Sequence, residues 1–202
     1  RLLRGMGYDA SVLLAAGTPK TADASKNYSL LPPGTPVYSL ETLSEAFVGV
    51  SCVVDCIYGT GFHGELRGAA PDILAAANKC RIRIAVDVPS GVNSDSGEID
   101  QRCFRPTNTL VLAAMKQGLL NVPASDILGE VTLLDIGIGE ECFRDNNVAF
   151  LTDDSMRRPF PEHGRNTHKG SFGRLVGFAG SLCFNGAAFM CANAALRSGV
   201  GL

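Results

Sequence analysis

The chain of 202 residues contains no Trp, only 7% aromatic residues and only three His, and it lacks an excess of either charge. Its 18 Lys and Arg nearly balance its 20 Asp and Glu, whereas nucleic-acid or anionic-membrane binding is usually marked by a basic surplus. We therefore expect neither nucleic acid nor a membrane as a partner. With 46% hydrophobic and 19% charged residues, the chain is too apolar to be intrinsically disordered.

The seven cysteines lack the spacing of a metal site or of a disulfide framework. Their number is odd and none forms a CxxC pair, although a zinc site would need such clustered ligands. Cys52, Cys56, Cys183 and Cys191 lie in apolar runs, where a free thiol behaves as a small hydrophobic group. The pattern indicates reduced thiols and hence a cytoplasmic protein.

A secretion signal is also missing, because Arg1 to Gly5 has no apolar core of a signal peptide. The 22 residues between Arg174 and Arg197 carry no formal charge, but Gly180 to Gly186 in their middle has the composition of a loop. A strand, a loop and a buried helix describe this segment better than a bilayer span. Because the chain does not begin with Met, we expect a soluble fragment that is cut at both ends.

Apolar strands alternate with helical stretches along the chain. Val50 to Ile57 is a near-continuous apolar run, as in a buried parallel strand, and Pro71 to Cys80 has apolar residues at helical spacing. Such alternation predicts a three-layer αβα, Rossmann-like α/β fold with a mostly parallel sheet over residues 1–150. The expected strands are 10–16, 37–40, 50–57, 83–88, 109–114 and 131–136, and the expected helices are 1–6, 41–47 and 71–80.

The composition changes near residue 152. Residues 151–167 are polar and charged and contain Pro, which is typical of a linker. Beyond them, residues 174–179 predict a strand and residues 187–198 a helix rich in small side chains. We expect residues 168–202 to begin a second α/β domain.

A glycine-rich loop follows the apolar run that ends at Ile57. Gly59, Gly61 and Gly64 would let backbone N–H groups approach a ligand closely, and such a nest suits a phosphate. The alternative is an ordinary turn in which glycine supplies a positive φ. The spacing is not GxGxxG at the start of a helix, which argues against an ordinary NAD-dependent oxidoreductase.

Acidic and hydroxyl residues follow two of the predicted strands. Asp55 lies near the end of one, while Asp87 and Ser90 follow the next, and ligands of open α/β sheets bind at such strand ends. Their oxygen atoms could hold a hard cation, or one carboxylate could move protons while the other binds. For Asp87 alone, the alternative is a hydrogen bond that caps the turn.

Several motifs resemble the amino-terminal domain of the YjeF family, the NAD(P)H-hydrate epimerases. They are DCIYGTGFHGELRG (55–68), AVDVPSGVNSDSGEI (85–99), TLVLAAMKQGLL (109–120) and GEVTLLDIGI (129–138). HKGSFGRLVGFAGS (168–181) and GAAFMCANAALRSGVGL (186–202) resemble the start of the partner domain, an ADP- or ATP-dependent NAD(P)H-hydrate dehydratase of ribokinase-like fold. The order of the motifs is that of the bifunctional bacterial repair enzymes.

The resemblance implies repair of a damaged nicotinamide cofactor. Water adds to the ring of NAD(P)H and gives R and S hydrates, NAD(P)HX, at carbon 6. The epimerase domain of the family interconverts the two hydrates. The dehydratase domain removes water from the S form at the expense of ADP or ATP.

The resemblance also assigns roles by position. Asp55 and Ser90 match potassium (K+) ligands, Asp87 matches a substrate contact, and Lys116 matches the family's lysine at a strand end. The carboxylate of Asp87 and the ammonium of Lys116 could move the proton that inversion at carbon 6 requires. The alternative for Lys116 is an ordinary solvated lysine. Ala187 matches a contact to the S hydrate in the dehydratase domain, and its alternative role is helix packing. The remaining substrate-binding positions are Gly59, Thr60, Gly61, Phe62, His63, Gly64 and Glu65.

One part of the family's pattern is absent. YjeF domains carry an Asn-Asn-Gly-Gly-Asp-Gly loop that supplies phosphate contacts and a potassium ligand, and this chain begins downstream of where that loop and its strand would lie. Similar domains also act as non-catalytic scaffold modules. Retention of Asp55, Asp87 and Ser90 together favours the enzyme, which we expect to be a homo-oligomer that acts on a small molecule.

Overall fold

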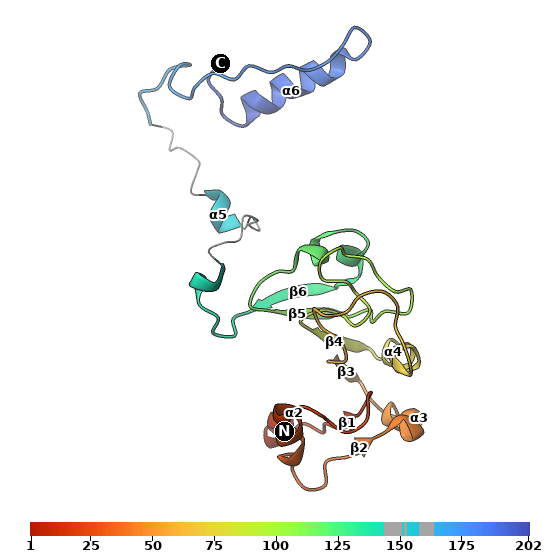
Figure 1. Ribbon diagram of the computed structural model, residues 1–202. Helices are drawn as coiled ribbons and strands as arrows, with labels where there is room; N and C mark the ends of the chain where they lie inside the picture. Colours follow the sequence, from red (N-terminus) through yellow and green to blue (C-terminus); the bar gives the residue numbers. More distant parts are fainter. Residues whose placement is uncertain (144–150, 152, 158–163) are drawn as a thin grey trace. The chain divides into compact units, whose positions relative to one another are not determined.

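The computed structural model describes residues 1–143, 151, 153–157 and 164–202 (Figure 1). Its contacts divide the chain into two compact units, Arg1–Asn147 and Val148–Leu202. Among the described residues, no helix combines the length and the apolar character needed to cross a bilayer. The domain boundary predicted near residue 150 lies next to residues that the structure does not describe, and it stays a prediction.

The centre of the first unit is a four-stranded, wholly parallel sheet. The order is β3-β4-β5-β6, so each strand pairs with the next one along the chain. The strands are β3 (Cys52–Asp55), β4 (Ile82–Val86), β5 (Asn108–Leu112) and β6 (Glu130–Leu134). The α/β class and the parallel sheet predicted from the alternation of strands and helices are confirmed.

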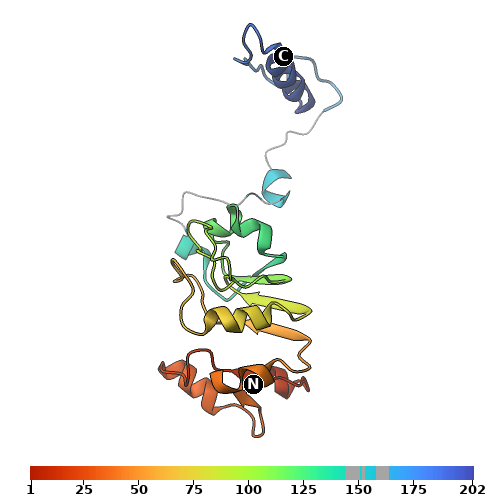
Figure 2. The ribbon, with the colours of Figure 1, turned by 90° about the vertical axis from the view of Figure 1, so that its right-hand side faces the viewer.

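The connections of this sheet gather on one face. Parallel strands that follow one another in a single direction, joined by right-handed crossovers, place all their connections on the same side. That side carries Ala85, Thr109 and Val111, each completely shielded from solvent. Helix α4 (Ala70–Ala77), which lies beside β3 and β4 in Figure 2, packs there, and the short 3₁₀ helices η2 (Gln117–Leu120) and η3 (Ala124–Ile127) follow.

Two clusters of buried side chains stabilise this face. Burying a side chain the size of Leu or Phe contributes about 1.5–3 kcal/mol. The cluster under α4 contains Phe62, Leu66, Ala70, Leu74, Ala77, Ala85 and Phe104. The cluster under η2 and η3 contains Val88, Val92, Val111, Leu119, Ala124 and Leu128.

The first 50 residues form a second, smaller sheet. Strand β1 (Val12–Leu13) pairs in parallel with β2 (Val37–Tyr38), and helix α2 (Ala22–Ser29) lies in the connection between the two strands. Helix α2 escaped sequence prediction because none of its residues is buried and it shows no apolar stripe. The available signal was Thr21, whose hydroxyl accepts the Ala24 N–H at 3.4 Å as a helix cap. The helices predicted at 1–6 and 41–47 are present as α1 (Leu2–Gly5), η1 (Leu40–Thr42) and α3 (Leu43–Ala46).

A cleft of about 860 Å³ separates this N-terminal segment from β3 and α4. Its lining includes Tyr38 of β2, Val54 of β3 and Ala77 of α4. The prediction of a buried strand at 50–57 was therefore wrong about burial, since Val54 is 45% exposed. The reason is that, within the described residues, β3 is hydrogen-bonded to β4 alone and forms an edge of its sheet.

In the second unit, helix α6 (Asn185–Arg197) forms as predicted, but the strand predicted at 174–179 does not. A strand needs a neighbouring strand to bond its backbone groups, and no described strand lies beside this segment. Its backbone bond to another part of the chain runs from the Leu175 N–H to the carbonyl of Leu202, at 2.8 Å. None of the described residues from 164 to 202 is buried. The expected linker contains a short helix, α5 (Asp153–Arg157), and otherwise lies largely outside the described residues; η4 (Glu140–Phe143) precedes it in the first unit.

Candidate active site

The polar residues predicted to form a site converge at the carboxyl edge of the four-stranded sheet. Asp55 is the last residue of β3, Asp87 directly follows β4, and Ser90 lies in the loop beyond it. The ends of parallel strands open on one edge, where the loops leave room for a ligand. The strand-end rule used on the sequence thus placed these residues on the correct edge.

Asp55 and Ser90 are in direct contact and both are buried, at 4% and 0% exposure. The Ser90 hydroxyl donates to Asp55 Oδ1 at 2.7 Å, and the Ser90 N–H donates to Asp55 Oδ2 at 2.8 Å. The Ile57 N–H also donates to Oδ1, at 3.2 Å, and the Tyr58 N–H donates to the Ser90 hydroxyl oxygen at 2.9 Å. Together these bonds join the end of β3 to the loop after β4.

Burial raises the pKa of the Asp55 carboxyl above its ordinary value, and the hydrogen bonds from Ser90 and Ile57 oppose that rise. A buried carboxylate is therefore stabilised by donors and would be stabilised further by a positive charge nearby.

The oxygens of Asp55 and Ser90 fit a hard cation only in part. Carboxylate and hydroxyl oxygens are the correct donor chemistry, but such ions take about six to eight oxygen ligands. The two side chains supply part of that number, and their oxygens already engage each other. Among the described residues, no cluster of three or more His, Cys, Asp or Glu side chains offers an alternative metal site.

Asp87 forms an ion pair with Lys116. The Lys116 ammonium donates to Asp87 Oδ1 and, at 2.7 Å, to the carbonyl of Leu112, while the Leu112 N–H donates to the same carboxylate oxygen at 3.2 Å. The Lys116 and Asp87 side chains are 19% and 20% exposed, so Lys116 is not a freely solvated lysine. The pair joins the ends of β4 and β5 and keeps one side open to solvent.

The backbone is strained at the same edge. Asp87 and Ala113, the first residues after β4 and β5, have φ values of 71° and 61°. Left-handed backbone costs a non-glycine residue about 1–3 kcal/mol and is concentrated at functional sites. In this geometry the Asp87 N–H still reaches the carbonyl of Leu110 at 2.8 Å, so the strain redirects the side chain without losing the bond.

The glycines of the Gly59–Glu65 loop do not all serve the turn. Only Gly64 has a positive φ, of 80°. Gly59 and Gly61 have ordinary φ values, and a Cβ added at either would meet nothing within 4 Å. The turn conformation thus requires glycine at one position of three, which favours close approach of a ligand over the plain-turn interpretation.

The other residues of this loop divide into core and surface. Phe62 is 7% exposed, packs against Tyr58 with ring centroids 5.3 Å apart, and donates its N–H to the carbonyl of Gly59 at 3.1 Å, so it belongs to the core of the loop. Thr60, His63 and Glu65 are exposed. Ala187, the expected contact in the second unit, is exposed on α6.

Sequence reasoning missed the residues that hold this loop in place. From the segment after β4, Ser94 and Asn93 hydrogen-bond to the loop, and Asp100 accepts a bond from Leu66, which directly follows it. The available signal was the density of short polar side chains in VNSDSGEID, residues 92–100, since such side chains bond to nearby backbone.

A parallel sheet that presents a glycine-rich loop, a buried Asp–Ser pair and an Asp–Lys ion pair at its carboxyl edge defines a Rossmann-like α/β protein, and ligands of such folds bind at that edge. Residues 1–118 match the family described as YjeF-related protein N-terminus, and the chain belongs to that family.

Curated relatives extend the similarity beyond these residues. The chain is 34% identical over 166 residues to the bifunctional NAD(P)H-hydrate repair enzyme Nnr of Moorella thermoacetica, covering 81% of this chain and 31% of the relative. It is 32% identical over 209 residues to the enzyme of the same name from Thermofilum pendens, covering 100% of this chain and 40% of the relative. This chain therefore spans well under half the length of either relative.

A solved structure shows the same fold. The crystal structure of yeast ynu0, YNL200c, superposes with a TM-score of 0.54 at 22% identity, covering 76% of this chain and 67% of the yeast chain.

Proposed function

We propose that this chain carries an NAD(P)H-hydrate epimerase that interconverts R- and S-NAD(P)HX in nicotinamide nucleotide repair. Membership of the YjeF family and the names of the curated relatives support the substrate class. The observation that carries the proposal is the half-buried Asp87–Lys116 pair at the carboxyl edge of the sheet.

The pair has the chemistry that inversion at carbon 6 demands. That carbon bears a hydroxyl group next to the ring nitrogen, so inversion breaks and remakes a bond from carbon to one of these heteroatoms. Either route needs one proton delivered and one removed. The Asp87 carboxylate is suited to accept a proton and the Lys116 ammonium to donate one, and each can be restored by the other.

The Gly59–Glu65 loop is the proposed binding segment for the nucleotide. The open space at Gly59 and Gly61 supports close approach of the substrate's phosphate groups to the backbone N–H groups of the loop. Thr60, His63 and Glu65 supply exposed polar groups along the same stretch, and Gly64 supplies the turn.

Asp55 and Ser90 are the residues that would hold a potassium ion. Such an ion would supply positive charge that favours binding of an anionic nucleotide. Their adjacent buried oxygens support this assignment, and further oxygen ligands are needed beyond these two side chains.

For the second unit, we propose that residues 168–202 begin a dehydratase domain that uses ADP or ATP, with Ala187 as a contact to the S hydrate. Support comes from the bifunctional relative of Thermofilum pendens, whose alignment covers 100% of this chain and 40% of its own length. All seven cysteines are free thiols, which supports a reducing compartment such as the cytoplasm. Homo-oligomer formation stays a prediction from the resemblance.

The proposed activity is tested by supplying R-NADHX together with an excess of a separate S-specific dehydratase. The chain, with any native sequence that flanks it, should accelerate NADH recovery in proportion to its concentration, above the spontaneous rate of epimerisation. Replacing potassium by a large organic cation should reduce that acceleration. A rate equal to the spontaneous one would instead identify a non-catalytic scaffold module.

A further inference from the structure

The Gly59–Glu65 loop and the residue on each side of it are hydrogen-bonded to a neighbouring segment, residues 90–102. Four of these hydrogen bonds involve residues 90–100, two of them at residues of the loop and one at the residue on each side of it. They are Tyr58 N–H to Ser90 Oγ at 2.9 Å, Ser94 Oγ to the Thr60 carbonyl at 3.1 Å, Asn93 Nδ2 beside His63 Nδ1 at 3.1 Å, and Leu66 N–H to Asp100 Oδ2 at 2.8 Å.

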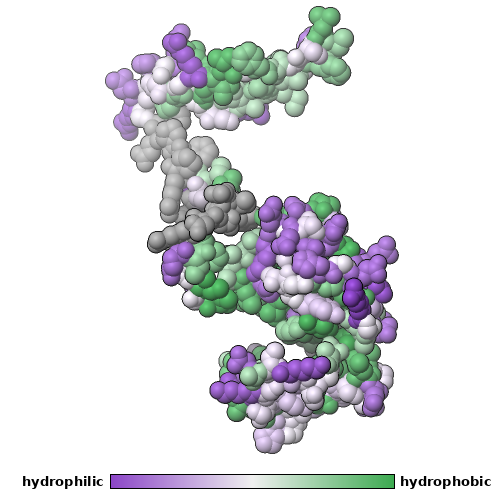
Figure 3. Space-filling model, in the orientation of Figure 1, coloured by the Kyte–Doolittle hydropathy of each residue, from purple (hydrophilic) through white to green (hydrophobic). Residues whose placement is uncertain are grey.

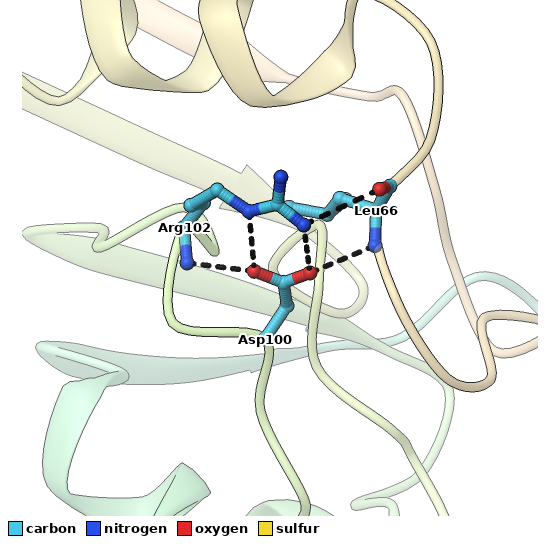
Figure 4. A network of polar contacts seen from close by, with 3 residues as sticks. All are labelled: Leu66, Asp100 and Arg102. Carbon is cyan, nitrogen blue, oxygen red and sulfur yellow. Dashed lines mark hydrogen bonds and ion pairs between the residues drawn. The ribbon is translucent and has the colours of Figure 1, made fainter.

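The last of these contacts is the best built (Figure 4). Asp100 Oδ1 accepts the Arg102 N–H at 2.8 Å and Arg102 Nε at 3.1 Å, and Oδ2 accepts Arg102 Nη2 at 3.0 Å. The Asp100 side chain is only 4% exposed, whereas Arg102 is 52% exposed. The two-pronged bond from Arg102 lowers the pKa of the Asp100 carboxyl well below its ordinary value, in keeping with a permanently charged acceptor.

Leu66 ties this contact to the loop. It directly follows Glu65, is 4% exposed, and packs with Phe62 and Phe104 in the cluster under α4. Its N–H points at Asp100 while its carbonyl lies 3.5 Å from Arg102 Nη2, so both sides of one residue meet the same ion pair. The end of the loop is thereby fixed in position and direction.

A glycine-rich loop left free would lose much backbone freedom when it binds a ligand, and that loss weakens binding. An attachment present before the ligand arrives removes part of this loss. Asp100 bonds to Arg102 and to Leu66 at the end of the loop, whereas Asp87 bonds to Lys116. A change at Asp100 therefore leaves the proposed proton-moving pair in place.

We propose that Asp100, held by Arg102, is a positioning residue that pre-forms the Gly59–Glu65 loop for its nucleotide ligand. This rests on the proposed function for the identity of the ligand, but not for the state of the loop. Loss of the Asp100 charge should loosen the loop and weaken substrate binding, while leaving turnover at saturation unchanged.

The test compares Asp100→Asn with a matched variant, Asp72→Asn. Asp72 is exposed in the first turn of α4 and its charge also acts on Arg102, but it does not bond to Leu66. In Asp100→Asn, amide hydrogen exchange in residues 59–66 should rise about tenfold or more, with the amides of β4 and β5 unchanged. KM for NADHX should rise by a similar factor at constant kcat, and Asp72→Asn should match the wild type in both.

Arg102→Lys keeps the charge but removes the two-pronged bond, so it should give a smaller change of the same kind. Unchanged loop exchange in Asp100→Asn overturns the proposal, and so does a rise spread equally over the loop, β4 and β5. A fall in kcat at constant KM overturns it as well. If the wild type fails to turn over NADHX, the proposed function fails, and the exchange measurement still decides whether Asp100 holds the loop.

Discussion

The four-stranded sheet region, residues 52–134, and the segment 164–202 both contain apolar stretches of sequence but differ completely in burial. In the first, Ala85, Phe104 and Val111 are at 0% exposure. In the second, Phe178 and Leu182 are 97% and 96% exposed, and apolar side chains cover the surface around α6 (Figure 3). An apolar sequence pattern therefore predicts a helix or a strand, but its apolar side chains become buried only where a neighbouring helix or strand packs against them.

The same contrast separates helices from strands. Helix α6 forms because its backbone groups bond within the helix, whereas residues 174–179 would need a second strand to satisfy theirs. The stretch 131–136 has a comparable sequence, and its first four residues belong to β6 because β5 lies beside them. Local patterns thus suffice for a helix and not for a strand.

The largest expected effect tests whether the chemistry belongs to the first region. Asp87→Ala should reduce R-to-S interconversion of NADHX by about 100- to 10,000-fold, because it removes one partner of the proton-moving pair. Asp87→Asn, which keeps the shape, should lose a similar factor. The rate is followed with excess dehydratase, and Asp126→Asn, an exposed carboxylate in η3, serves as the control. Near wild-type turnover in Asp87→Asn would reduce Asp87 to a hydrogen-bonding contact.

The next prediction measures the difference in burial directly. Leu74→Ala, at 1% exposure under α4, should lower the free energy of unfolding by about 2–5 kcal/mol. Leu182→Ala, at 96% exposure in the second unit, should change it by less than about 0.5 kcal/mol. Urea unfolding midpoints of the two variants decide the matter. A comparable loss in both would mean that the second unit buries Leu182 against a partner in solution.

A smaller effect concerns the Asp55–Ser90 contact. Ser90→Ala removes a donor from a buried carboxylate and should cost about 1–3 kcal/mol at neutral pH, with exposed Ser125→Ala as the control. Since the donor lowers the pKa of Asp55, its loss raises that pKa further. A raised pKa in the folded state stabilises the fold at low pH, and this contribution is lost as pH rises through it. The deficit of Ser90→Ala should therefore shrink as pH falls from neutrality, and a constant deficit from neutral to acid would contradict this account.

The smallest effect tests backbone strain at the strand ends. Ala113→Gly relieves a φ of 61°, while glycine adds freedom to the unfolded chain. These two contributions oppose each other, so we expect a net stabilisation of no more than about 1 kcal/mol, seen as a rise in Tm. Substitution of exposed Ala75 in α4 by Gly should instead lower Tm.

Much of the fold followed from periodicity, and part of the site followed from the strand-end rule. The sequence indicated that Asp55, Asp87 and Ser90 lie at one edge, because parallel strands end together. The resemblance grouped Asp55 with Ser90 and Asp87 with Lys116, but it did not indicate that the members of each group bond directly to each other, since those contacts depend on loop conformations far apart in sequence. Asp100 was missed for the same reason, because its role comes from a turn that brings it to Leu66.

The serial order of the sheet also has a consequence for biosynthesis. Strands β3 to β6 pair in the order in which the ribosome produces them, so each arriving strand meets a partner that has already left the exit tunnel. Each pairing joins residues that lie 22 to 30 positions apart, as with Cys52 and Ile82, so no pairing has to wait for a strand made much later. Lys116 emerges well after Asp87, so during synthesis the carboxylate precedes its ammonium partner and the ion pair forms only when β5 has docked.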